Sequence, residues 1–418
     1  MNGQQDRSAR LRAELVEHLA EDRELTDARV TAALLDVPRH LFVPGVALAE
    51  AYADQAIVTH HRDGLPVSSA SQPAIVAAML EQLSPPTGGS VLEVGAGTGY
   101  NAALLSALVG PFGRVVTVDI NPEVVVEAEN HLSVAGVANV EVIRGDGASG
   151  WADRAPYDGI IVTAGASDVA PAWLSQLAPA GRLVVPLSIR AVQQCVAFAR
   201  ADGHLRSLAV CEAGFMPLTG AMANADIRLP VPGRPGVHVL AAPGTVVDAG
   251  LIGRAMDAQG PAAAAGITAS ALEVFGSLRR WLAFRDPAAA ALMYSGPVAG
   301  ADASGVPQVL EHPLGGQVQR SSPCLLGATG FAIFDAVRRG ALVAGAGLRT
   351  ELDLAVRACG SADDEARRLG ELVKAWDAAS RPGADRLRID AYPAGVAVPD
   401  NEGSVHRARH TTFVVSSR

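Results

Sequence analysis

The chain has 418 residues, of which 49% are hydrophobic and only 18% are charged, so it can bury a sizeable core and is not a disordered polymer. At roughly 100 to 200 residues per domain, this length predicts two or three domains. The formal net charge of -9 argues against a non-specific nucleic-acid binder, and the single lysine, Lys374, excludes both a P-loop and Schiff-base chemistry.

The first predicted elements are helices. Apolar residues recur at helical spacing over residues 8–36 and again over 73–83, where two prolines end the pattern. Between these helices, Val37-Pro-Arg-His-Leu-Phe-Val-Pro44 is typical of a loop bracketed by prolines.

From residue 90 onwards, short apolar runs alternate with helical patterns. This alternation predicts βαβ units and a parallel sheet, which binds ligands at the carboxyl ends of its strands. The expected strands are residues 90–94, 114–118, 140–143, 159–163 and 181–186, and the expected helices are 102–109, 122–136 and 170–177.

The signals weaken beyond residue 222, where proline and glycine crowd residues 230–236. We therefore expect a catalytic domain over 1–222 and a separate α+β domain over 223–418. The second domain is expected to hold helices at 273–284 and 363–380 and strands at 237–240, 387–391 and 411–415.

The strongest local signal is Glu93-x-Gly-x-Gly-x-Gly99 after the strand over 90–94, followed by Asp119 at the end of the next strand. Glycines let the backbone approach a ligand closely, and an acid at this distance accepts hydrogen bonds from ribose hydroxyls. Glu93 would repel the phosphates of a dinucleotide, so a cationic ligand without phosphate fits better.

Together with Gly145-Asp-Gly147, this pattern resembles the S-adenosylmethionine motifs of class I methyltransferases. The resemblance implies a Rossmann-like domain with a mixed, mostly parallel sheet, and S-adenosyl-L-homocysteine as the product. The cofactor contacts that it implies are Glu93, Gly95, Ala96, Gly97, Gly99, Tyr100, Asp119, Ile120, Gly145, Asp146 and Gly147.

Further segments make the resemblance specific to protein-L-isoaspartate O-methyltransferase, and they occur in that family's order over nearly all of residues 30–190. They are Val37-Pro-Arg-His-Leu-Phe-Val-Pro44, Ala51-Tyr-Ala-Asp54, Ser71-Gln-Pro73, Pro156-Tyr-Asp158 and Leu177-Ala-Pro-Ala-Gly-Arg-Leu-Val-Val-Pro186. The family methylates a carboxylate, which is already ionised at neutral pH and needs no strong general base.

The resemblance implies that Ser71 orients the substrate carboxylate by a hydrogen bond, with Ser69 in support. The alternative for Ser71 is a cap on the helix that begins near Pro73, and both roles can coexist. The segment over 58–68 is longer and more charged than in conventional members. Its His60, His61 and Arg62 are candidate contacts to an acidic peptide, or ordinary surface-loop residues, and the histidines lack a third metal ligand.

The domain over 223–418 is a second departure from conventional members. Extended homologues resemble methyltransferases that accompany ribosomally made modified peptides such as lanthipeptides, lasso peptides and graspetides. The resemblance implies methylation of one aspartate side chain, which then closes to a succinimide (aspartimide) or hydrolyses to isoaspartate. Candidate recognition residues, or simply solvated charges, are Arg338, Arg339, Arg349, Arg367, Arg368 and His406-Arg-Ala-Arg-His410.

Peptide tailoring is therefore the first hypothesis, and general isoaspartyl repair is the alternative. A non-catalytic scaffold is disfavoured because Ser71, Glu93, Asp119 and Asp146 are all present. We expect a peptide or protein partner, no nucleic acid, no metal and no membrane. The absence of an apolar signal or spanning segment favours a cytoplasmic location, and the oligomeric state stays open.

Overall fold

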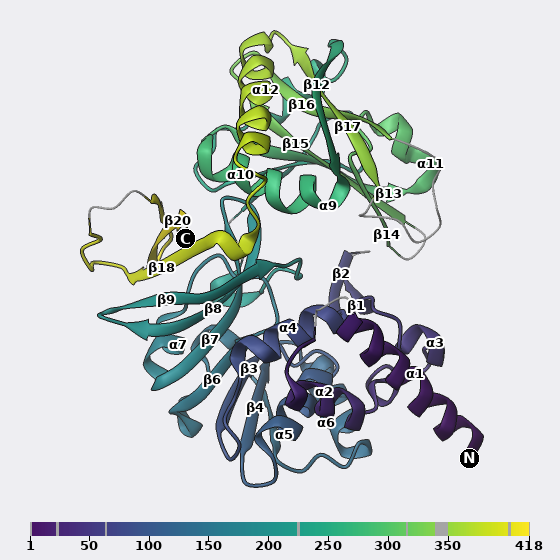
Figure 1. Cartoon of the computed structure of the whole chain (residues 1–418), viewed down its shortest axis with the longest axis vertical. Coiled ribbons are helices and arrows are strands. Elements are labelled where there is room, and N and C mark those ends of the chain that lie inside the picture. Colours follow the sequence, from purple (N-terminus) through teal and green to yellow (C-terminus); the bar gives the residue numbers. More distant parts are fainter. Residues whose placement is uncertain are drawn as a thin grey trace. The chain divides into compact units, whose positions relative to one another are not determined.

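The computed structural model of the chain divides into two compact units, shown in Figure 1 with colours that follow the sequence. The first unit comprises residues 1–187, 193–224 and 388–418, and the second comprises 188–192 and 225–387. The structure describes residues 2–21, 25–62, 65–223, 226–314, 317–338, 350–399 and 403–417.

A ten-stranded sheet runs through the first unit in the order β19-β20-β18-β9-β8-β7-β6-β3-β4-β5. The run from β7 to β5 is parallel, as the alternation of strands and helices predicts, and β8 pairs with β9 antiparallel. The strands are β3 (Ser90–Val94), β4 (Arg114–Asp119), β5 (Val140–Arg144), β6 (Tyr157–Val162), β7 (Leu177–Ile189), β8 (Val192–Ala201), β9 (His204–Glu212), β18 (Leu387–Pro393), β19 (Ser404–Arg407) and β20 (Thr411–Ser417).

Helices of the first unit bury their apolar faces in one core together with this sheet, and the side chains of Leu104 and Leu105 in α5 are fully buried there. A separate two-stranded hairpin, β1 (Ile57–Arg62) and β2 (Leu65–Ala70), forms where the sequence suggests a charged loop. The helices are α1 (Asn2–Glu21), α2 (Ala28–Asp36), α3 (Leu48–Ala51), α4 (Pro73–Leu83), α5 (Tyr100–Val109), α6 (Pro122–Val134) and α7 (Pro171–Gln176).

The last strands of the chain do not belong to the second unit. Strand β18 pairs antiparallel with β9, so that Asp390 lies opposite Arg206 and Ala391 opposite Leu205. Ile389 is fully buried there. The expected division into 1–222 and 223–418 therefore differs from the structure, because residues 388–418 complete the first unit.

The second unit is built on an antiparallel sheet in the order β10-β11-β13-β15-β16-β17-β12, with β14 also paired to β15. Its helices are α8 (Ala249–Ala255), α9 (Ala271–Glu273), α10 (Arg279–Arg285), α11 (Val298–Ala301) and α12 (Asp363–Ala378), and a π-helical turn joins α9 to α10. The strands are β10 (Ile227–Pro230), β11 (Val237–Ala241), β12 (Gln259–Ser270), β13 (Ala289–Pro297), β14 (Leu310–Leu314), β15 (Gln317–Leu326), β16 (Gly330–Arg338) and β17 (Glu351–Gly360).

Both faces of this second sheet are buried. Along β16, Phe331 and Ile333 pack into one hydrophobic cluster, whereas Ala332 and Phe334 pack into another. This division follows from the alternation of side chains along a strand. The second cluster also takes up Trp376 of α12, so the second unit has a core of its own and is an α+β domain.

Two of the arginines suggested for peptide recognition form ion pairs. On α12, Arg367 pairs with Asp364 and Glu371, and Arg368 pairs with the buried Asp286 at 2.7 Å. The residues of the 406–410 cluster belong to the first unit. Arg339 and Arg349 lie outside the described residues, and Arg338 ends β16.

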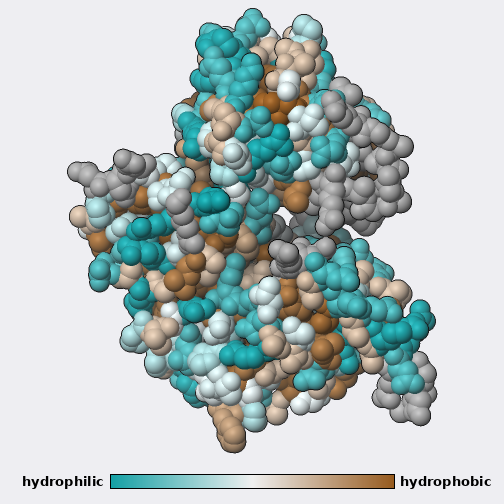
Figure 2. All heavy atoms as spheres, viewed as in Figure 1, coloured by the Kyte–Doolittle hydropathy of each residue, from teal (hydrophilic) through white to brown (hydrophobic). Residues whose placement is uncertain are grey.

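The surface mixes residue types on the face drawn in Figure 2, where hydrophobic residues are interspersed with hydrophilic ones on both units. In the described part of the chain, no helix combines the length and the apolar character that crossing a bilayer requires. The four cysteines are free, and Cys195 on β8 lies opposite Cys211 on β9.

Candidate functional site

A glycine-rich loop joins β3 to α5 at the carboxyl end of the parallel strands. Gly95, Gly97 and Gly99 have φ angles of 103°, 51° and 85°, a region that side chains disfavour. A Cβ atom on Gly95 would also lie only 2.5 Å from the Oγ1 atom of Thr163. The loop therefore needs glycine for its backbone shape, and it leaves the backbone open to a close ligand.

The carboxylate of Glu93 is fully buried immediately before this loop. It accepts hydrogen bonds from Thr117 at 2.6 Å and from the side-chain amide of Asn101 at 2.8 Å. Burial raises the pKa of Glu93 to about 7, although both hydrogen bonds favour the ionised form and Asp119 opposes it. The site therefore holds an acid that a nearby positive charge would convert to the anion.

Asp119 ends β4, the strand next to β3, and is half-buried. Its Oδ2 atom is 3.4 Å from the backbone amide of Gly97, and its Oδ1 atom accepts from the amide of Asn121 at 2.9 Å. The backbone carbonyl of Asp119 also accepts from Gly145 after β5. These contacts join the ends of three parallel strands around the glycine loop.

Asp146, which follows β5, is held by backbone amides. Its Oδ1 atom accepts from Ala148 and its Oδ2 atom from Ala221, both at 2.9 Å. Gly147 is buried, and its carbonyl accepts from the indole of Trp173 at 2.8 Å. Asp146 therefore fixes the turn after β5 and the segment around 221, in addition to the ligand contact that the resemblance implies.

Three other residues expected at the cofactor differ in exposure. Ala96 and Tyr100 are buried, and the Tyr100 ring packs against Phe42 with 5.6 Å between ring centroids. Ile120 is 43% exposed. The side chains of Ala96 and Tyr100 therefore support the loop from within the core, whereas Ile120 presents an apolar side chain at the surface beside Asp119.

The β1–β2 hairpin brings Ser69 to the glycine loop. The carbonyl oxygen of Ser69 is 3.5 Å from the position that a Cβ atom would take on Gly97. Ser69 itself is half-buried near the end of β2. The β1–β2 hairpin, which is not part of the ten-stranded sheet, thus contributes backbone to one side of the site.

The three charged residues of this hairpin have different environments. Nε2 of His60 lies 3.2 Å from the Oε1 atom of Glu127 on α6, and the His60 side chain is only 18% exposed. His61 and Arg62 are exposed. His60 therefore connects the hairpin to α6, while His61 and Arg62 remain open to solvent at the end of β1.

Ser71 lies between β2 and α4 but does not cap the helix. The cap position is Gln72, which makes no side-chain cap bond, and the amide of Ala74 donates instead to Asp54 at 2.9 Å. The Ser71 carbonyl accepts from Arg39 at 3.0 Å. Within the described part of the chain, no hydrogen bond occupies the Ser71 hydroxyl, which leaves it available to a ligand.

Sequence reasoning assigned no role to five residues that shape the site. Thr117 could have been found, because a hydroxyl inside an otherwise apolar strand needs a partner. The others bond to backbone atoms or depend on tertiary packing, and their roles have no local signature. The five residues are Arg39, Asp54, Asn101, Thr117 and Thr163.

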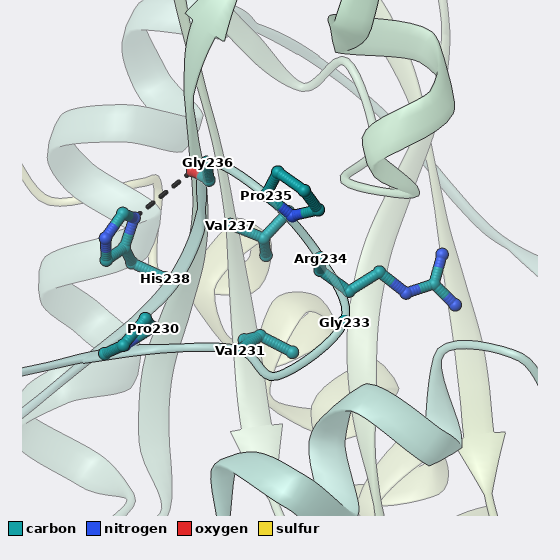
Figure 3. A pocket seen from close by; sticks show the side chains of 8 residues that line it. All are labelled: Pro230, Val231, Gly233, Arg234, Pro235, Gly236, Val237 and His238. Carbon is teal, nitrogen blue, oxygen red and sulfur yellow. Dashed lines mark hydrogen bonds between the residues drawn. The ribbon is translucent and has the colours of Figure 1, made fainter.

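The second unit has a hollow of its own, shown in Figure 3, with a volume of about 340 Å³. It is lined by residues 230, 231 and 233–238 at the turn between β10 and β11. His238 contacts the Gly236 carbonyl at 3.2 Å, and Arg234 extends away from Pro235 and Val237. The lining offers no carboxylate, hydroxyl or thiol, and it includes none of the expected site residues.

Residues 10–223 match the family described as "Protein-L-isoaspartate(D-aspartate) O-methyltransferase (PCMT)". The chain is 42% identical over 213 residues to the protein-L-isoaspartate O-methyltransferase of Methanopyrus kandleri, covering 50% of this chain and 92% of that protein. It is 42% identical over 198 residues to the enzyme of that name from Methanoregula boonei, covering 47% and 88%.

A solved structure named protein-L-isoaspartate O-methyltransferase aligns with a TM-score of 0.49 at 21% identity, covering 91% of this chain and 96% of that one. The family match and both relatives concern about half of the chain. Residues beyond 223 lie outside the family match.

Proposed function

This chain belongs to the protein-L-isoaspartate O-methyltransferase family, and we propose that it methylates the α-carboxylate of isoaspartyl residues in proteins or peptides. It is accordingly an S-adenosylmethionine-dependent carboxyl methyltransferase. One observation supports the proposal above the others: Ser69 and Ser71 lie on the segment that borders the glycine loop, and the Ser71 hydroxyl has no hydrogen-bond partner among the described residues.

The residues around the glycine loop fit S-adenosylmethionine. This cofactor carries a sulfonium and an ammonium cation, and the loop is flanked by the acids Glu93 and Asp119. Asp119 would accept hydrogen bonds from ribose, and Ile120 would cover one face of the adenine. The backbone of the glycine loop would lie against the rest of the cofactor.

The transfer itself needs orientation more than acid–base catalysis. When bound, S-adenosylmethionine would supply an electrophilic methyl group for transfer to a carboxylate oxygen, with S-adenosyl-L-homocysteine as the leaving group. The substrate carboxylate is ionised at neutral pH, so no proton has to move. Ser71, supported by Ser69, would hold this carboxylate in line with the methyl group.

A pair of peptides that differ only in one isoaspartyl or aspartyl linkage tests the proposal. We expect the enzyme to add one methyl ester to the isoaspartyl peptide and none to its partner, as measured by mass spectrometry. A protein that binds S-adenosylmethionine but esterifies neither peptide would contradict the proposal. Esterification of the aspartyl peptide alone would favour the second candidate described next.

The second candidate is a tailoring enzyme for one aspartate of a ribosomally made modified peptide. The observation that favours it is the second unit, since residues 225–387 form a core of their own outside the family match. Such an enzyme would give a peptide heavier by one methyl group and then a succinimide lighter than the starting peptide by one water. Neither product is expected from a general repair enzyme acting on intact aspartyl peptides.

Replacing Asp119 by Ala should weaken S-adenosylmethionine binding by about 1 to 3 kcal/mol, because charge-assisted hydrogen bonds to ribose would be lost. Titration calorimetry with the unreactive product S-adenosyl-L-homocysteine gives the same comparison without turnover. The matched control is Asp202→Ala in the exposed β8–β9 turn, which makes the same charge change elsewhere. Equal dissociation constants for Asp119→Ala and wild type would refute the assignment.

A further inference from the structure

Arg39 is fully buried and binds backbone rather than an acid. Its guanidinium lies at the centre of a group of carbonyl oxygens from two chain segments. Nη1 donates to Ala51 at 2.7 Å and Ala53 at 3.3 Å, and Nη2 donates to Gln55 at 3.1 Å and Ser71 at 3.0 Å. Arg39 therefore joins the end of α3 and the residues after it to Ser71, which lies between β2 and α4.

Asp54 makes a second connection between the same two segments. Its Oδ1 atom accepts from the amide of Ala74 at 2.9 Å, and its Oδ2 atom accepts from the Gln72 side chain at 2.7 Å. Ser71 thus follows β2 at a point where its own carbonyl is held by Arg39 and the next residues are held by Asp54. The backbone around Ser71 is thus fixed, while its hydroxyl makes no hydrogen bond to any residue that the structure describes.

Stability alone is a poor explanation for this arrangement. Burial lowers the pKa of Arg39, since the charged form loses its hydration. In addition, Nε of Arg39 is buried and has no hydrogen-bond partner among the described residues. A buried cation with an unsatisfied donor is costly, and such groups persist where a site needs a defined geometry.

We propose that Arg39 and Asp54 are positioning residues that fix the Ser71 backbone and so aim its hydroxyl at the acceptor carboxylate. The proposal rests on the proposed function, because it assigns the two residues an effect that passes through Ser71. A shift of a positioning group by about 1 Å can cost about a hundredfold in rate. Loosening either connection should therefore lower kcat without weakening cofactor binding.

A double-mutant cycle in the full-length enzyme tests this dependence on Ser71. Arg39→Lys keeps the charge but loses the planar fork, Asp54→Ala removes the second connection, and Ser71→Ala removes the hydroxyl. Each single variant should lower kcat at least about tenfold while the dissociation constant for S-adenosyl-L-homocysteine stays within about twofold. In the Ser71→Ala background, Arg39→Lys and Asp54→Ala should have almost no further effect, because the group that they aim is gone.

The matched control is Asp27→Ala, which removes a side-chain cap from α2 in the same unit. Asp54→Ala and Asp27→Ala should both lower the unfolding temperature, but only Asp54→Ala should lower kcat. The proposal would be overturned if Arg39→Lys or Asp54→Ala lowered kcat by the same factor in the Ser71→Ala background as in wild type. An unchanged kcat in folded Arg39→Lys and Asp54→Ala would also overturn it.

Amide hydrogen exchange provides a readout that is independent of turnover. The amide of Ala74 should exchange faster in Asp54→Ala than in wild type, and unchanged exchange would show that Asp54 does not hold this helix end. The kinetic cycle uses whichever of the isoaspartyl and aspartyl peptides the wild type esterifies. If the wild type esterified only the aspartyl peptide, the proposed function would be wrong. The double-mutant cycle could still be measured with that peptide and would still test the roles of Arg39 and Asp54.

Discussion

A chain that ends at Leu387 should lose the folded methyltransferase unit, although it keeps every residue of the family match. Strand β18 supplies the buried Ile389, and β20 supplies three further large apolar side chains that are buried, namely Phe413, Val414 and Val415. Burial of each large apolar side chain is worth about 1.5–3 kcal/mol. The loss therefore approaches the whole stability of a typical domain, about 5–15 kcal/mol.

Polar contacts between β18 and β9 add to the loss of stability. The carboxylate of Asp390 pairs with Arg388 at 2.8 Å and with Arg206 at 3.3 Å, and it is only 8% exposed. The His204 ring stacks on Tyr392 with 4.5 Å between centroids. Truncation would leave His204, which is buried, facing solvent along the open edge of β9.

Thermal unfolding and S-adenosyl-L-homocysteine binding measure the outcome. The matched control replaces residues 226–386 by a flexible Gly/Ser linker and retains 387–418, so that β18 can still pair with β9. We expect cooperative unfolding and cofactor binding in this excision variant, and neither in the truncated chain. A truncated chain that melts and binds like the full-length protein would contradict the assignment of 388–418 to the first unit.

The same strands show where sequence analysis reaches its limit. The pairing of β9 with β18 joins residues such as Ser207 and Ile389, which are 182 positions apart. No local pattern specifies a partner at that distance, so the sequence places the last strands in the second domain. In contrast, β3 to β6 were predictable, because buried parallel strands separated by helices leave a strong local periodicity.

The residues of the candidate site also differ in whether the sequence predicts them. Glu93 and Asp119 could be predicted as site residues because a strand followed by glycines, and an acid at the end of the next strand, have a recognisable spacing. The arrangement around Ser71 could not, because Arg39 binds carbonyl oxygens that every residue carries. The charge and length of residues 58–68 suggest a loop, whereas the structure forms the β1–β2 hairpin with two register shifts, and such irregularities disrupt the regular pairing of a strand.

Binding of S-adenosylmethionine should strengthen as the pH rises, by about 30-fold between pH 5.5 and pH 8 if Glu93 stays ionised in the complex. The cause is the buried carboxyl of Glu93, whose pKa burial raises from 4.5 to about 7 in the unliganded protein. A cationic ligand favours the anion, so binding below pH 7 must release the proton that Glu93 holds. The affinity for S-adenosylmethionine should become independent of pH above this pKa.

The product provides a comparison within the same site. S-adenosyl-L-homocysteine lacks the sulfonium charge, so its affinity should depend less steeply on pH than that of S-adenosylmethionine. The variant for this test is Glu93→Gln, which keeps partners for Thr117 and Asn101 and removes the titration. A pH dependence of the affinity that persists in Glu93→Gln would contradict its assignment to Glu93.

Protein stability without ligand should show the opposite sign. Because the folded-state pKa is raised, the folded protein binds more protons than the unfolded chain between about pH 4.5 and 7, and stability falls as the pH rises through this window. Above pH 7 the ionised, buried carboxylate costs up to about 3 kcal/mol, which Glu93→Gln should recover. Glu93→Gln should therefore unfold at a higher temperature than wild type at pH 8 and yet bind S-adenosylmethionine more weakly, a combination that a purely structural glutamate would not produce.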